Sequence, residues 1–138
     1  KKFTIKLAAD ETYDSTITYD PVREVLSLDR SRSGYMYDIL HKRDIQVKPA
    51  GGEVTLRILM DRFSVEIFIN DGSQTATMVL FTPQEADNIS FAADGKAQIS
   101  VDKYALTFLT KYMREGRRCV MLACLFSFLK AVFFCSGK

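Results

Sequence analysis

Short apolar runs separated by turn residues recur along most of the chain, and this pattern constrains the fold more than any other feature. The runs occupy residues 3–10, 15–20, 24–29, 53–61, 64–70, 75–81, 88–94 and 96–106. Most of them alternate apolar and polar side chains, which is the period of a strand with one buried face. No helical period occurs before residue 110. The pattern predicts an antiparallel β-sandwich or barrel, with residues 35–50 as a long connection that holds one edge strand.

The stretch LRILMDRFSVEIFINDGSQTATMVLF, residues 56–81, predicts two consecutive hairpins. A two-residue turn at Arg62-Phe63 pairs Asp61 with Ser64, and a second turn at Asp71-Gly72 follows Asn70. This register places nine apolar side chains of the three strands on one face. They are Leu56, Ile58, Met60, Val65, Ile67, Ile69, Ala76, Met78 and Leu80.

Two carboxylates, Asp61 and Glu66, share the opposite face of the first hairpin. Their diagonal separation is about 7–8 Å between backbones, within the range of about 6.5–9.5 Å that inverting glycosidases use. Any two acids in this relation produce the same spacing, so the pattern is not specific. A structural interpretation is favoured, in which Glu66 pairs with Arg57 across the strands and Asp61 caps its own turn.

Composition excludes several other classes of function. The formal net charge of +2 divides into +5 over residues 111–138 and −3 over the rest, so the body has no basic surface for nucleic acid. The only histidine, His41, is interpreted as a polar loop residue. One histidine and cysteines spaced C-x4-C-x10-C do not form a conventional set of metal ligands. No nucleophile-elbow, phosphate-loop or dinucleotide motif is present, so we expect neither a metal nor a cofactor.

The segment LRILMDRFSVEIFINDG resembles the C-terminal β-sandwich module of glycoside hydrolase family 32, the fructan- and sucrose-cleaving enzymes. The family typically shows L-R-I-L-V-D-R-S-S-V-E-V-F-V-N-D-G at this place. Residues 19–34, which end in the D-R-x-x-S-G pattern, and residues 88–106 resemble flanking parts of the module. The resemblance covers residues 3–107 and marks a structural motif. Its members are Asp61, Arg62, Ser64, Glu66, Asn70, Asp71 and Gly72.

The resemblance implies a sandwich of two packed antiparallel sheets, of concanavalin or jelly-roll type, and a non-catalytic function. In the family, catalysis belongs to an N-terminal five-bladed propeller with the motifs W-x-N-D-P-N and R-D-P and a Glu before Cys. None of these is present here, since Arg43-Asp44 lacks the proline, so we assign no catalytic residue. We expect an accessory domain that supports a propeller, in an enzyme that is either cytoplasmic or secreted. Fructan binding and homo-oligomerisation are the alternatives.

The end of the chain departs from the family pattern. We interpret residues 1–110 as the sandwich module and residues 111–138 as an atypical tail, and the start at Lys1 indicates a fragment or processed product. Residues 119–135 are apolar except for Ser127 and Lys130, which predicts a helix that is buried or membrane-bound. Three interpretations remain open: an out-of-frame extension, a helix packed on the sheet or a partner, and a membrane anchor that follows a basic stretch.

Overall fold

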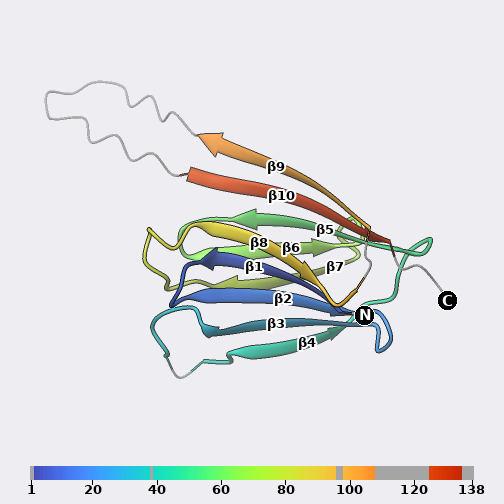
Figure 1. The fold of residues 1–138 in the computed structure, drawn as a ribbon, viewed down its shortest axis with the longest axis horizontal. Helices are drawn as coiled ribbons and strands as arrows, with labels where there is room; N and C mark the ends of the chain where they lie inside the picture. Colours follow the sequence, from blue (N-terminus) through green and yellow to red (C-terminus); the bar gives the residue numbers. More distant parts are fainter. Residues whose placement is uncertain (1, 38, 96–97, 108–124, 135–138) are drawn as a thin grey trace, which may run out of the picture.

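In the described part of the chain, two antiparallel sheets of five strands each pack around one core (Figure 1). The computed structural model describes residues 2–37, 39–95, 98–107 and 125–134. The strands are β1 (Phe3–Ala9), β2 (Asp14–Asp20), β3 (Val25–Arg32), β4 (Lys42–Gln46), β5 (Glu53–Met60), β6 (Ser64–Ile69), β7 (Gln74–Val79), β8 (Asn88–Ala93), β9 (Ile99–Thr107) and β10 (Leu125–Phe134). The first sheet has the order β4-β3-β2-β1-β8, and the second has the order β7-β6-β5-β10-β9. The predicted sandwich is confirmed.

The hydrophobic core lies between the sheets, and alternate residues of each strand supply it. Ile5, Ile17 and Leu26 reach it from the first sheet, and each is at most 1% exposed. Leu56 and Ile67 reach it from the second sheet and are fully buried. Burying one such side chain stabilises a fold by about 1.5–3 kcal/mol. The alternation in the sequence is therefore the property that holds the two layers together.

The central hairpins have the predicted register. The Asp61 N–H donates to the Ser64 carbonyl at 2.9 Å, which closes the turn at Arg62-Phe63. The cross-strand pairs are Met60–Val65, Ile58–Ile67 and Leu56–Ile69 between β5 and β6, and Val65–Met78 and Ile67–Ala76 between β6 and β7. The inward face is buried as expected, with Met60 partly exposed at its end. The edge strand expected within residues 35–50 is β4, which pairs with β3.

The predicted helix over residues 119–135 is wrong for the part of that segment that the structure describes. Residues 125–134 form strand β10, which lies between β5 and β9 (Figure 1). Leu129 lies opposite Ile58 and Ala131 opposite Leu56, and both tail residues are buried in the core. Phenylalanine and valine favour strands, and β5 offers a row of backbone groups that a further strand can pair with. The tail therefore extends the sheet.

The remaining expectations for the tail fall outside the described residues. They concern the basic stretch, the three cysteines and the boundary at residue 110, all of which lie in 108–124 or 135–138. Within the described part of the chain, no helix has the length and hydropathy needed to cross a membrane.

Candidate functional site

The Asn-Asp-Gly turn between β6 and β7 has a structural role. Asn70, Asp71 and Gly72 have positive φ values of 45°, 57° and 88°, a conformation that these residue types adopt most readily. The Asn70 side chain also accepts a hydrogen bond from the Thr55 N–H at 3.2 Å and donates one to the Lys48 carbonyl at 2.8 Å. Asn70 therefore ties the end of β6 to β5 and to the connection that precedes it.

Asp61 and Glu66 lie on the outer face of the β5–β6 hairpin, as predicted. The Asp61 carboxylate accepts the N–H of Arg62 in the turn. Glu66 is exposed and lies opposite Leu59 of β5 and Thr77 of β7. A pair of catalytic carboxyl groups needs an enclosed pocket around it, and an open strand face does not provide one. The hydrogen bond to Arg62 agrees with the turn-capping role expected of Asp61.

The expected ion pair between Arg57 and Glu66 is not among the ion pairs of the described residues. The Arg57 guanidinium instead lies over the ring of Phe68, 4.7 Å from the ring centroid. Phe68 is directly opposite Arg57 in the register, whereas Glu66 is diagonal to it. The nearer neighbour therefore binds the cation, through its ring face.

The D-R-x-x-S-G segment, residues 29–34, joins the two sheets at one end of the sandwich. The Ser33 carbonyl accepts the Phe81 N–H at 3.0 Å, and Gly34 forms a parallel bridge with Phe81. Gly34 has a φ of +86°, and a Cβ placed there would lie 2.2 Å from the Phe81 carbonyl oxygen. Only glycine fits this close approach, which explains the glycine in the motif.

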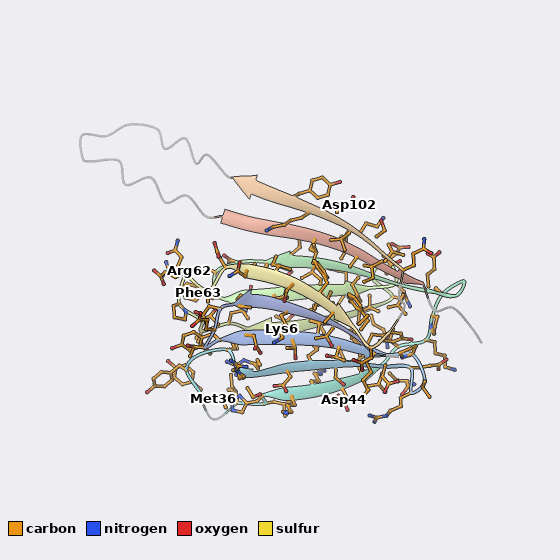
Figure 2. All side chains as sticks on the ribbon, viewed as in Figure 1. Lys6, Met36, Asp44, Arg62, Phe63 and Asp102 are labelled. Atoms are coloured by element: carbon orange, nitrogen blue, oxygen red, sulfur yellow. The ribbon has the colours of Figure 1, made fainter. Side chains whose placement is uncertain are left out.

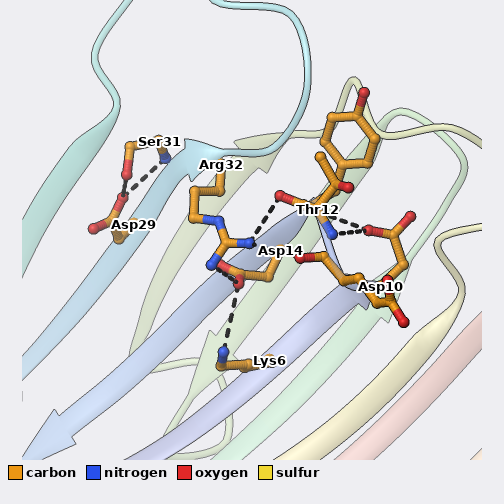
Figure 3. Close-up of polar contacts among 9 residues, drawn as sticks. Lys6, Asp10, Thr12, Asp14, Asp29, Ser31 and Arg32 are labelled. Carbon is orange, nitrogen blue, oxygen red and sulfur yellow. Dashed lines mark hydrogen bonds and ion pairs between the residues drawn. The ribbon is translucent and has the colours of Figure 1, made fainter.

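A polar cluster on the first sheet surrounds Asp14 (Figure 3). The Asp14 carboxylate is mostly buried and forms ion pairs with Arg32 at 3.1 Å and Lys6 at 3.5 Å. Arg32 also donates to the Thr12 carbonyl at 2.8 Å. Two cations therefore satisfy this carboxylate, which leaves it suited to holding three strands together rather than to acid catalysis.

A second acid of the same sheet, Asp29, has a pKa below its ordinary value. Burial raises this pKa, but hydrogen bonds from the hydroxyl and N–H of Ser31, together with Lys42, lower it by more. The Lys42 ammonium lies 2.9 Å from the carboxylate. Asp29 is therefore ionised over the whole physiological range and neutralises Lys42.

Arg30 is the functional candidate that the sequence analysis did not identify. It is 4% exposed, and its Nε donates to the Val79 carbonyl at 2.9 Å across the gap between the sheets. Nη1 lies 3.2 Å from Nδ1 of His41, and the guanidinium carbon lies 5.3 Å from the centroid of the Phe81 ring. The signal was present in the sequence, because Arg30 continues the inward-facing positions of Leu26 and Leu28.

A shallow hollow of about 180 Å³ opens beside Arg30, between β3, β4 and β7. The residues that line it include Arg30, Leu40, His41, Lys42, Arg43 and Thr77. His41 lies directly before β4, consistent with its interpretation as a loop residue. None of the predicted motif residues lines this hollow, so it is separate from the central hairpins.

The topology, the closed core and the motif contacts define a two-layer antiparallel β-sandwich module. Residues 1–107 match the family model described as "Glycosyl hydrolases family 32 C terminal". The chain therefore belongs to glycosyl hydrolase family 32, and residues 1–107 correspond to the C-terminal domain of that family. The resemblance drawn from the sequence is confirmed.

Individual relatives agree with this family. A levanase of Bacillus subtilis is 32% identical over 105 residues, which are 71% of this chain and 15% of the levanase. A probable sucrose-6-phosphate hydrolase of Vibrio cholerae is 36% identical over 86 residues, 62% of this chain and 15% of that protein. An exo-inulinase structure from Aspergillus awamori shares the fold, with a TM-score of 0.64 and 22% identity over 96% of this chain and 22% of that one. The chain thus spans about 15% of the length of these two relatives.

Proposed function

We propose that this chain is the non-catalytic β-sandwich of a fructan- or sucrose-cleaving glycosidase and that it supports a catalytic propeller domain of the same protein. The observation that carries the proposal is the family match over residues 1–107, with a levanase and a sucrose-6-phosphate hydrolase among the relatives. The acids of the domain agree with it. Those of the central hairpin lie on an open face, and Asp14 and Asp29 are paired with cations.

An apolar end of the sandwich offers a surface for the propeller. We define it by large apolar side chains that are 42–72% exposed in the β3–β4 connection and the β5–β6 turn. They are Tyr35, Met36, Tyr37, Ile39, Leu40 and Phe63. Figure 2 shows Met36 and Phe63 at the same end of the molecule. Clustered exposed apolar side chains of this kind mark protein contacts, and a propeller is the partner that membership of the family implies.

The first experiment tests whether the chain is catalytic. The purified full chain is incubated with sucrose, inulin and levan, and released fructose is measured. No release above the buffer blank is expected. Turnover that disappears in Asp61→Asn or Glu66→Gln would show that the outer face of the hairpin is an active site and would overturn the proposal.

The second experiment tests support of a propeller. The full chain replaces the corresponding domain of the Bacillus subtilis levanase, and the melting temperature and levan hydrolysis of the chimera are compared with those of the propeller alone. A higher melting temperature is expected. Leu40→Ser should remove part of this gain, whereas Val22→Ser should not, because Val22 is 83% exposed in the β2–β3 turn at the other end of the strands. No gain, combined with saturable quenching of tyrosine fluorescence by levan, would instead assign the apolar end to sugar binding.

A further inference from the structure

One nitrogen of the buried Arg30 guanidinium, Nη2, has no hydrogen-bond partner in the described part of the chain. Nε donates to the Val79 carbonyl and Nη1 to His41, but Nη2 has less than 1 Å² of exposed surface and no partner among the residues that the structure describes. A guanidinium has only donors, so the missing partner is an acceptor, and Nδ1 of His41 must also accept. A buried donor of a charged group left unsatisfied is costly, and native structures provide a partner for nearly all such groups.

The charges around the hollow distinguish an anion from a water molecule as that partner. Three basic residues, Arg30, Lys42 and Arg43, line the hollow, and no acidic residue among those that the structure describes does. Asp29 neutralises Lys42 at 2.9 Å. Arg30 and Arg43 have no carboxylate partner among the ion pairs of the described residues. Two uncompensated positive charges beside a partly enclosed space attract an anion far more strongly than a neutral molecule.

The edge of β7 adds a further donor. The Val79 carbonyl bonds to Arg30, so it faces away from β6 and toward the hollow. Residues two apart in a strand turn their backbone groups to the same side, so the N–H and the carbonyl of Thr77 both point in this direction, and the N–H is the group that can bind an anion. Donors therefore converge on the hollow from β3, β4 and β7, and two of the residues that line it, Leu40 and Arg43, have exposed side chains.

We propose that this hollow is an oxyanion-binding site, in which Arg30 and Arg43 bind a phosphate or carboxylate group. A phosphate is the better match to donors that come from three directions, because its oxygens are arranged as a tetrahedron. Phe81 covers one face of the Arg30 guanidinium, so the anion approaches its edge. The site does not depend on the proposed accessory function, because Arg30 and Arg43 lie outside the apolar end; Leu40 alone belongs to both.

The test uses the full chain in a zwitterionic buffer, with inorganic phosphate, acetate and chloride added at matched ionic strength. The melting temperature is followed together with the NMR signal of the Arg30 Nε–H group. Phosphate is expected to raise the melting temperature saturably and to shift the Arg30 signal. Chloride should do neither. A saturable response to acetate that equals the response to phosphate would identify the ligand group as a carboxylate, within the same proposal.

Arg43→Gln is the test variant, because Arg43 is exposed and its loss should not prevent folding. The apparent Kd for phosphate should rise about tenfold or more, as expected when one charge-assisted hydrogen bond is lost. Arg23→Gln, an exposed arginine in the β2–β3 turn, is the matched control and should keep the Kd of the unchanged chain. An equal response to chloride, or equal Kd values for both variants, would overturn the proposal.

Discussion

Replacing Leu129 with alanine should lower the free energy of unfolding by about 2–5 kcal/mol. Leu129 is 2% exposed and lies on β10 opposite Ile58 of β5. The truncation removes three carbon atoms, and at about 0.8 kcal/mol each the lost transfer free energy is about 2.4 kcal/mol. The cavity left between the sheets adds to this loss. Domains are stable by about 5–15 kcal/mol in total, so the change removes a large fraction of the stability.

Urea unfolding, followed by tyrosine fluorescence and circular dichroism, measures this effect. With a dependence of about 2 kcal/mol per molar urea, the midpoint should fall by about 1–2.5 M. Lys130→Ala is the matched control, because Lys130 is the exposed neighbour on the same strand and its change should stay within about 0.5 kcal/mol. Equal midpoints for Leu129→Ala and the unchanged chain would refute the packing of β10 on β5.

Three further predictions follow from the motifs. Asn70→Ala should cost about 2–3 kcal/mol in urea unfolding, because it removes two hydrogen bonds to backbone and leaves a left-handed residue; Asn70→Gly, which tolerates the backbone, should cost less. Gly34→Ala should destabilise by more than about 1 kcal/mol in the same assay, since its Cβ would meet the Phe81 carbonyl. The contacts of Asp29 lower its pKa in the folded state below the value in the unfolded chain. They therefore stabilise the fold fully above about pH 4, and this stabilisation is lost as the pH falls through the lowered pKa. The loss of unfolding free energy caused by Ser31→Ala should therefore be smaller at acid pH than at neutral pH. A loss that is the same at both pH values would contradict the role of Ser31 in lowering the pKa of Asp29.

The central hairpins could be predicted because their information is local. A two-residue turn and a period of two determine which side chains share a face, and the register from Leu56 to Leu80 followed from these rules. The same rules placed Asp61 and Glu66 on the outer face. The predicted register also places Phe68 directly opposite Arg57, but the expected partner was the diagonal Glu66, because an ion pair was favoured over a contact with an aromatic ring.

The tail shows where local information was insufficient. An apolar run such as 125–134 fits a helix or a strand equally well, and its length favoured a helix. The structure places it as a strand because β5 offers unpaired backbone groups and the core accepts Leu129 and Ala131. A partner that lies about 70 residues earlier in the chain therefore decides its conformation, and no local pattern records that partner.

The sequence by itself determined the strands of the family module, the register of the hairpins and the family, because alternation and turn chemistry are properties of adjacent residues. Only the tertiary structure decided the order of the strands in each sheet and which segments meet at the end of the sandwich. Arg30 shows the difference. Its inward position can be read from the alternation, but its contacts with Val79, His41 and Phe81 join segments up to 51 residues apart in the chain. The hollow with unpaired positive charge exists only where those segments meet.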